Sequence, residues 1–236
     1  MGWGCALNTR TLTGTGDEIE REDLVEFRLL FEGELLPSAG SKKRASEKHV
    51  IRQSFHPQLR RLWTINSNLR QLAGQYYKAP FPGPNGGNPP IPSDQERFDG
   101  GIAKIGENWS RAGFQFVPLV TSDMALRCSI DITILRPEDD RFIFEAGDID
   151  GQLKTLFDAL RIPKDAGECG GAIPQADETP FFCLLEDDRL VSEVRVSTDQ
   201  MLLLPNRREV KANDAHAVIH VKLNHKNART FDNYFG

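Results

Sequence analysis

The sequence lacks both a long hydrophobic run and any paired arrangement of cysteines. A membrane-spanning helix needs about 20 consecutive apolar residues, and no run among the 236 residues approaches that length. The cysteines are Cys5, Cys128, Cys169 and Cys183, without a CxxC spacing or a closely spaced Cys/His pair. These absences argue against a membrane protein, a disulfide scaffold and a structural zinc site. We therefore expect reduced thiols in a cytoplasmic protein, and residues 1–16 lack the basic start and apolar core of a signal peptide.

An excess of positive charge is also missing, since the formal net charge is −5. This balance argues against a uniformly basic protein that binds nucleic acid without specificity. It leaves a nuclease open, because an acidic metal site can lie beside a local basic patch. Hydrophobic residues make up 39% and charged residues 27%, as in an ordinary soluble globular protein. The length fits one large domain or a small domain with insertions.

Alternating apolar and polar residues predict several strands, and helical spacing predicts fewer helices. The expected strands cover residues 25–31, 113–120, 126–135, 141–145, 181–185, 190–196 and 215–223. The expected helices cover about 46–63, with an interruption near Pro57, then 67–77, and the segment from Asp150 onward. Strands in hairpin-like succession with interspersed helices indicate an α+β fold, with a mixed β-sheet and packed helices.

Three segments fall outside this pattern. Residues 1–22 are rich in Gly, Thr and charge and are expected to form a flexible leader, and residues 225–236 a polar tail. Residues 79–101 carry six of the fourteen prolines and five glycines. We expect a long exposed loop there, either a lid over a substrate or a plain insertion into the domain.

The expected site is organised around a helix that follows two carboxylates, Asp148 and Asp150. An apolar stripe at i, i+3, i+4 and i+7 predicts one buried face, formed by Leu153, Leu156, Phe157 and Leu160. Asp150, Lys154 and Asp158 follow one another at i+4 steps and share a different, polar face. Taken alone, this pattern is explained by helix stability, because acids at a helix start cap exposed N–H groups and i,i+4 pairs attract.

A second acidic cluster, Glu186-Asp187-Asp188, lies further along the chain at the start of an expected strand. Mg²⁺ prefers oxygen ligands, so two or three carboxylates can hold it beside a phosphate. Such a site activates water and neutralises the transition state of phosphodiester hydrolysis, and a nearby lysine stabilises the developing charge. Packed carboxylates repel one another without a cation. We therefore expect the two clusters to meet around a divalent metal.

The stretch DIDGQLKTLFDAL from Asp148 to Leu160, followed by LEDDRLV from Leu185 to Val191, resembles the RusA family of Holliday junction resolvases. That family's pattern is Asp-x-Asp-Asn, a lysine four residues after the second Asp, Phe-Asp-Ala-Leu and, after a loop, Asp-Asp entering a strand. The resemblance covers about residues 126–200 and extends weakly to the first strand, the basic helix and the last strand. It implies a RusA-like nuclease domain over residues 23–224 that depends on Mg²⁺ or Mn²⁺. It also implies a homodimer that hydrolyses branched DNA in recombination and repair.

The resemblance also assigns roles to individual residues. The implied metal ligands are Asp148, Asp150, Asp188 and, as a further member of the second cluster, Asp187. Lys154 is implied as the catalytic cation, and Asp158 is expected to support the site by holding Lys154. Gly151 stands where the family has Asn, and the loop 162–180 is longer than in compact family members. Both departures concern substrate choice more than the metal site.

A basic segment precedes the first helix and continues into it. Its candidate phosphate contacts are Lys42, Lys43, Arg44, Lys48 and Arg52, since Lys and Arg supply most sequence-independent affinity for nucleic acid. A solvated charged helix face is the alternative interpretation. Two other functions stay open for the whole chain. One is a non-catalytic RusA-like module with a decayed metal site that binds nucleic acid or a protein; the other is a metal-dependent enzyme acting on another phosphate ester.

Overall fold

The computed structural model describes residues 25–38, 44–79, 91–137, 149–202, 211 and 213–225. The larger sheet has the order β1–β7–β4–β6; β1 and β4 run antiparallel to β7, and β6 runs parallel to β4. These strands are β1 (Glu26–Glu34), β4 (Leu126–Arg136), β6 (Val191–Gln200) and β7 (Asp214–His225). A smaller sheet contains β2 (Ser110–Arg111), β3 (Phe114–Val120) and β5 (Phe181–Leu185). The expected α+β fold with a mixed sheet is confirmed.

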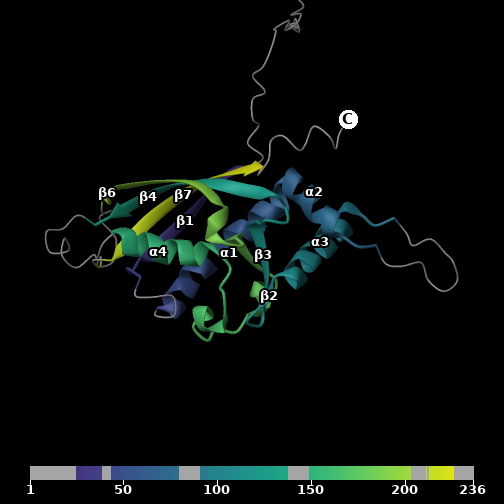
Figure 1. The fold of residues 1–236 in the computed structure, drawn as a ribbon, viewed down its shortest axis with the longest axis horizontal. Coiled ribbons are helices and arrows are strands. Elements are labelled where there is room, and N and C mark those ends of the chain that lie inside the picture. The colour runs from purple at the N-terminus through teal and green to yellow at the C-terminus, as the bar shows by residue number, and fades with distance from the viewer. Residues whose placement is uncertain are drawn as a thin grey trace, which may run out of the picture.

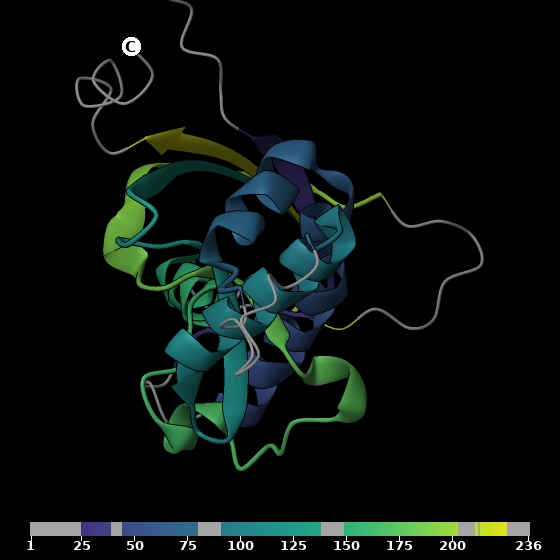
Figure 2. The ribbon, with the colours of Figure 1, turned by 90° about the vertical axis from the view of Figure 1, so that its right-hand side faces the viewer.

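Helices cover one face of the larger sheet and leave its other face open (Figures 1 and 2). The helices are α1 (Ala45–Ile65), α2 (Ser67–Tyr76), α3 (Asp94–Asn108) and α4 (Ile149–Leu160), with 3₁₀ turns η1 (Ala166–Cys169), η2 (Ala176–Glu178) and η3 (Asp188–Leu190). Alternation along β7 explains the one-sided packing: Ile219 and Val221 are buried, whereas His220 and Lys222 lie on the open face. Among the described residues, no helix is both long and apolar enough to span a membrane.

The first helix is longer than expected. α1 continues through Pro57 without a break, although a proline inside a helix costs about 3 kcal/mol. Phe55 and Leu59 on either side are buried in the core. We attribute the unbroken helix to this packing, which the proline spacing alone did not reveal.

The loop expected over 79–101 is shorter than predicted. α3 begins at Asp94, and Ser93 and Glu96 form a capping box that satisfies its first N–H groups. α3 packs closely on α2, because a Cβ on Gly101 would lie 1.9 Å from the carbonyl oxygen of Ala73. The glycines that indicated a loop therefore include one that helix packing requires. Residues 80–90, and the strand expected at 141–145, lie outside the described residues.

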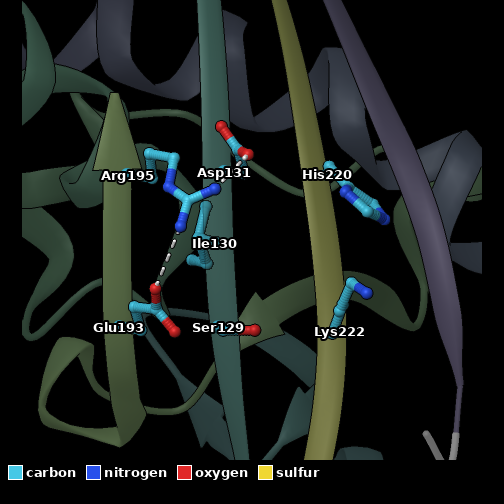
Figure 3. A pocket seen from close by; sticks show the side chains of 7 residues that line it. All are labelled: Ser129, Ile130, Asp131, Glu193, Arg195, His220 and Lys222. Carbon is cyan, nitrogen blue, oxygen red and sulfur yellow. Dashed lines mark ion pairs between the residues drawn. The ribbon is translucent and has the colours of Figure 1, made fainter. Parts of the chain in front are cut away.

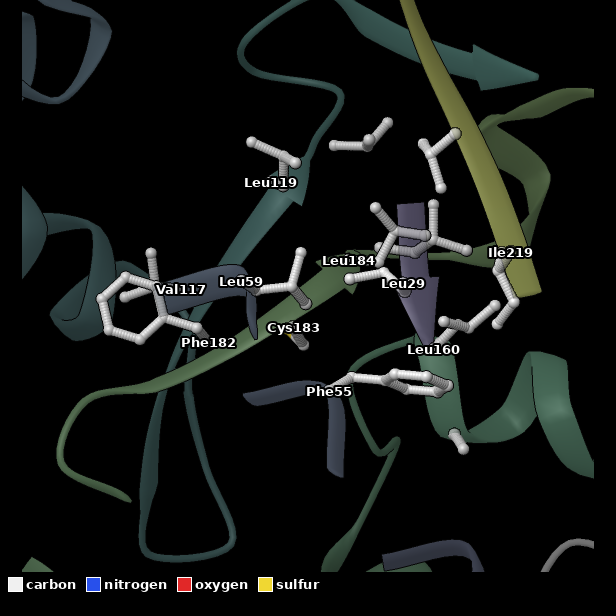
Figure 4. Packing of buried hydrophobic residues seen from close by; sticks show 14 of the residues in the cluster. Leu29, Phe55, Leu59, Val117, Leu119, Leu160, Phe182, Cys183, Leu184 and Ile219 are labelled. Atoms are coloured by element: carbon white, nitrogen blue, oxygen red, sulfur yellow. The ribbon is translucent and has the colours of Figure 1, made fainter. Parts of the chain in front are cut away.

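One hydrophobic cluster joins the larger sheet, the smaller sheet and the helices between them (Figure 4). It contains Leu29 of β1, Phe55 and Leu59 of α1, Leu160 of α4, Leu184 of β5 and Ile219 of β7. These residues come from segments far apart in the sequence, so a single core fixes the position of α4 relative to both sheets.

We expect the three described cysteines to resist alkylation in the native protein. Cys128, Cys169 and Cys183 are buried and free. Burial raises the pKa of Cys128 to about 12 and also raises the pKa of the other two thiols, while only the thiolate reacts readily. Peptide mapping after iodoacetamide treatment should find these positions unmodified, and modified after unfolding in guanidinium. Equal labelling of folded and unfolded protein would contradict the burial.

Candidate functional site

The start of α4 is fixed by contacts at the C-terminal end of β4. The guanidinium of Arg136, the last residue of β4, donates a hydrogen bond to the side-chain carbonyl of Gln152. The backbone N–H of Ser38 donates to the carbonyl of Gly151 at 2.8 Å. At the position where the RusA pattern has Asn, the backbone of this chain therefore makes a contact of its own. The first turn of α4 is consequently placed at one defined end of the larger sheet.

Asp150 and Lys154 are exposed one helical turn apart on the same face of α4. Neither side chain forms a hydrogen bond or an ion pair with another residue that the structure describes. Their charges are not used to hold the fold together, which leaves them available to a ligand. Asp148, the predicted partner of Asp150, lies outside the described residues. The structure thus brings Asp150 and Lys154 together, and their chemical roles stay predictions.

Asp158 does not hold Lys154 as expected, because it binds two buried cations instead. Its carboxylate accepts hydrogen bonds from Lys48 Nζ at 2.6 Å and from the guanidinium of Arg161 at 2.8 Å. Burial raises the pKa of Asp158, but the bond from Lys48 and the charge of Arg161 outweigh it, and the pKa lies below its ordinary value. α1 packs against this turn of α4, so Asp158 faces the interior while Asp150 and Lys154 face solvent.

The contacts of Asp158 belong to a buried network that ties α1 to α4 and η1. Arg161 also pairs with Glu168 of η1 at 3.0 Å, and Arg52 of α1 donates to the backbone carbonyl of Asp158 at 2.9 Å. Buried charges are tolerated only when they are paired and hydrogen-bonded. We therefore assign these residues to stability and not to ligand binding.

Two of the predicted phosphate contacts are wrong for the same reason. Lys48 and Arg52 are each only 1% exposed, so neither reaches the surface where a DNA backbone would lie. Arg44 is half-buried and donates to the carbonyl of Pro37 at 2.8 Å. Lys42 and Lys43 lie outside the described residues, and their contact with nucleic acid stays a prediction.

The sequence did carry a signal for the buried cations. The buried residues of α1 recur at helical spacing and include Lys48, Ile51, Arg52, Phe55 and Leu59. Two cations thus lie within the stripe that faces the core. A cation in an apolar stripe predicts a buried partner, and Asp158 fills that role 110 residues away in sequence. Only the partner's identity required the tertiary structure.

The second acidic cluster is partly used by the fold. Asp187 accepts a hydrogen bond from the backbone N–H of Arg189 at 3.0 Å and pairs with its guanidinium at 2.8 Å, which holds the pKa of Asp187 well below its usual range. Glu186 accepts from the N–H and the hydroxyl of Ser122, both at 2.9 Å. Asp188, the first residue of η3, is exposed. Asp188 is therefore the member of this cluster that is most accessible to a ligand.

The two acidic clusters do not meet within one chain, contrary to our expectation. Asp150 lies at the end of the sheet where Arg136 finishes β4. Asp188 lies at the opposite end, before β6, whose first residue Val191 pairs with Cys128 near the start of β4. The strand from position 128 to position 136 is about 26 Å long at 3.3 Å per residue. Because Mg²⁺ binds its ligands at about 2.1 Å, Asp150 and Asp188 of one chain cannot hold the same ion.

The path of the chain explains this separation. β4 and β6 are parallel neighbours, and the chain that joins them includes α4, on the helix-covered side of the sheet (Figure 1), followed by β5. The start of α4 and the start of β6 must then lie at opposite ends of the sheet. Among the described residues, no three His, Cys, Asp or Glu side chains are grouped so as to hold a metal ion. Asp148 lies outside the described residues.

The open face of the sheet carries a hollow of about 260 Å³ between β6, β4 and β7 (Figure 3). Its polar lining residues are Ser129, Asp131, Glu193, Arg195, His220 and Lys222. Acidic and basic side chains alternate here: Arg195 lies 4.0 Å from Asp131 and 3.8 Å from Glu193, and His220 and Lys222 both pair with Glu26. The charges compensate one another, so this hollow has no strong preference for an anion or a cation.

No protein-family model, no curated protein and no solved structure matches this chain. The exposed, unpaired charges at the start of α4 therefore remain the main structural guide to function.

Proposed function

We propose that this protein is a RusA-like endonuclease that depends on a divalent metal and cuts branched DNA as a homodimer. The observation that carries the proposal is the contrast along the polar face of α4. Asp158 is engaged by Lys48 and Arg161, whereas Asp150 and Lys154 are exposed and form no ion pair with a described residue. The buried charge is thus paired, whereas a carboxylate and an ammonium stay exposed together at the start of α4. These are groups that phosphodiester hydrolysis needs.

The donor set fits a hard divalent cation. Asp150 and Asp188 offer exposed carboxylate oxygens, which are the ligands that Mg²⁺ and Mn²⁺ prefer. A bound metal of this kind supplies an activated water and neutralises charge on the phosphate. Lys154 lies one turn beyond Asp150, so its ammonium can contact a phosphate oxygen and stabilise the negative charge that develops there. Asp148 is proposed as a further ligand on the same turn.

A homodimer resolves the separation of the clusters. Asp150 and Asp188 lie at opposite ends of a strand pair that is about 26 Å long, so a shared ion requires carboxylates from two copies. In a two-fold dimer, Asp150 of one copy can approach Asp188 of the partner subunit, and the symmetry then creates two equivalent sites. Two sites related by a two-fold axis suit a four-way junction, which presents two equivalent strands for cleavage. Such a substrate fits a cytoplasmic enzyme of DNA recombination and repair.

Cleavage of branched DNA by the purified protein tests this function. We expect Mg²⁺ or Mn²⁺ to support cutting of a four-way junction or a flap in preference to plain duplex, and EDTA to abolish it. Lys154→Ala should lower kcat on the order of 100-fold, as expected for the loss of one group that stabilises transition-state charge. Lys164→Ala, a similar change at an exposed lysine in the loop after α4, is the matched control and should stay near wild type.

The outcomes separate this function from its alternatives. Absence of cleavage of junction, flap and duplex with both metals, together with no metal binding by calorimetry, would overturn the enzyme and favour a non-catalytic binding module. Metal binding without DNA cleavage would retain the metal site and reject the substrate. A small phosphodiester that is hydrolysed without competition from DNA would indicate an enzyme of another phosphate ester.

A further inference from the structure

Strand β6 forms an edge of the larger sheet in the part of the chain that the structure describes. It is ten residues long and pairs there only with β4. Eight of its residues are exposed, and Val191 and Val196 are half-buried. Exposed edge strands are usually protected by proline, lysine, a short length or a covering segment. β6 contains neither proline nor lysine, and its charged residues, Glu193, Arg195 and Asp199, are of mixed sign. It also carries an exposed valine, Val194, which is 46% accessible.

We propose that β6 pairs antiparallel with β6 of a second copy of this chain, with Val194 opposite Val194 of the partner subunit. The two larger sheets, with four described strands each, then form one continuous sheet. A two-fold axis perpendicular to the sheet keeps the helices of both copies on the same face. Directly opposite residues in an antiparallel pair have their side chains on the same face. This symmetry therefore allows only registers in which one residue of β6 lies opposite itself.

The charges of β6 select among these registers. Centred on Val194, the pairing places Glu193 opposite Arg195 of the partner subunit and, by symmetry, Arg195 opposite Glu193 of the partner subunit. Centred one residue earlier, it would place Glu193 opposite itself; centred one residue later, Arg195 opposite itself. Like charges directly opposite destabilise a strand pair, and opposite charges stabilise it. Of these three registers, the one centred on Val194 is thus the complementary one, and it also pairs the two exposed valines.

The side chains involved are available for this contact. Glu193 and Arg195 lie on the open face of the sheet (Figure 3) and are 65% and 72% exposed. Arg195 is only loosely paired within its own chain, at 3.8 Å from Glu193 and 4.0 Å from Asp131. Val194, two residues before half-buried Val196, lies on the opposite face, toward the helices. Self-pairing of β6 would therefore give the two charges close partners and remove an exposed valine from water.

This register also affects the proposed metal site of Asp150 and Asp188. That effect rests on the proposed function, whereas the β6 interface does not. With Val194 at the centre, Val191, the first residue of β6, lies opposite Ser197 of the partner subunit, and Asp188, in the 3₁₀ turn just before β6, lies near the end of the partner's β6. Within each chain Gln200 pairs with Arg136, whose guanidinium holds the first turn of α4 through Gln152. The same pairing that fits the charges thus directs Asp188 toward the end of the partner's sheet at which α4 begins, which is the side that the composite site requires.

Charge reversal tests the interface without reference to activity. In the Glu193→Arg variant, an arginine at position 193 lies opposite an arginine at position 195 of the other copy, at both symmetric positions. In the Arg195→Glu variant, two glutamates lie opposite each other in the same way. We expect each change to raise the dimer dissociation constant at least about tenfold. An equimolar mixture should form a heterodimer, because every facing pair is again of opposite charge. Arg28→Glu, the same change on β1 at the other edge of the sheet, is the control and should remain a dimer.

Light scattering coupled to size-exclusion chromatography measures the outcome. The proposal requires a dimeric wild type and control, two variants that dissociate alone, and a mixture that associates. A monomeric wild type, a single reversal that leaves the dimer intact, or a mixture that stays monomeric would each overturn it. Because the measured quantity is mass in solution, an inactive but correctly associating protein would reject the nuclease and retain the interface.

Discussion

An equimolar mixture of the Asp150→Asn and Asp188→Asn variants should regain about one quarter of the wild-type capacity to nick branched DNA, as expected for random assembly of two-fold dimers. Each variant alone should lose at least about a hundredfold in kcat, because loss of a charged ligand or charge-stabilising group has effects of that size. The recovery has a geometric cause. The two carboxylates lie at opposite ends of the β4–β6 pair in one chain, so each site of the proposed dimer would take one carboxylate from each copy.

The fraction follows from counting sites. Half of the randomly assembled dimers contain one copy of each variant. Such a dimer has one site in which both carboxylates are altered and one in which both are native. Nicking, and not paired resolution, is therefore the correct measurement, because only one site per mixed dimer is intact. Co-expression with two different affinity tags allows the mixed dimer to be purified and assayed by itself.

Two controls make the result decisive. Asp94→Asn makes the same chemical change at an exposed carboxylate at the start of α3, and it should leave activity unchanged. Light scattering should show that both inactive variants are still dimers. An inactive mixed dimer of normal mass would show that Asp150 and Asp188 are not shared between copies. An active Asp150→Asn variant would remove Asp150 from the site altogether.

Asp158→Ala should destabilise the protein by about 3–5 kcal/mol, the usual cost of removing one partner from a buried ion pair. Lys48 and Arg161 would lose the carboxylate that binds both of them, at 2.6 Å and 2.8 Å. Glu168 still pairs with Arg161, so this cation keeps one carboxylate partner after the change. Urea unfolding followed by circular dichroism measures the difference, and Asp123→Ala, at an exposed carboxylate in the turn before β4, serves as the control.

The pH dependence of this effect has a defined sign. Because the pKa of Asp158 is lowered in the folded protein from an ordinary value of 3.8, its contribution is fully present above that value. The contribution is lost as the pH falls below 3.8 and through the lower folded pKa. The stability gap between wild type and Asp158→Ala should therefore be constant near neutral pH and narrow in strong acid. A gap that widens on acidification would contradict the ionised state of Asp158.

A second measurement distinguishes a lost ion pair from a lost packing contact. Lys48→Met also breaks the pair, and it replaces a buried ammonium by an apolar side chain of similar length. The double variant Lys48→Met, Asp158→Ala should cost less than the sum of the single changes, since residues in direct contact are coupled. Additive costs would mean that the two side chains contribute independently.

Local periodicity was sufficient to predict much of the fold. The alternation of Ile219 and Val221 with His220 and Lys222 predicted the last strand and its two faces, and β7 has both. The apolar stripe of residues 153–160 predicted α4, and Leu156 and Leu160 are buried. Spacing of this kind is a property of the helix or strand itself. The same spacing placed Asp150 and Lys154 side by side on the surface.

Packing between distant segments decided what periodicity left open. Asp158 belongs to the same i+4 series as Asp150 and Lys154, yet α1 covers it and Lys48 binds it. Lys48 and Arg52 belong to a basic segment, but the core stripe of α1 takes both inside. No local pattern shows against which neighbour a helix will pack. Spacing alone therefore predicts Asp158 beside Lys154 and predicts Lys48 and Arg52 on a DNA-binding surface, and the structure has neither arrangement.

The sequence by itself determined the elements of this protein and the exposure of a carboxylate and a lysine at the start of α4. Only the tertiary structure decided where the second acidic cluster lies. Parallel strands need a connection that returns along the sheet, and the connection from β4 to β6 includes α4 and, after it, strand β5 of the smaller sheet. An antiparallel β6 would begin beside Asp150, but the observed parallel β6 begins at the far end. The direction of one strand therefore separates Asp150 from Asp188 and makes a second copy of the chain necessary for a site that uses both.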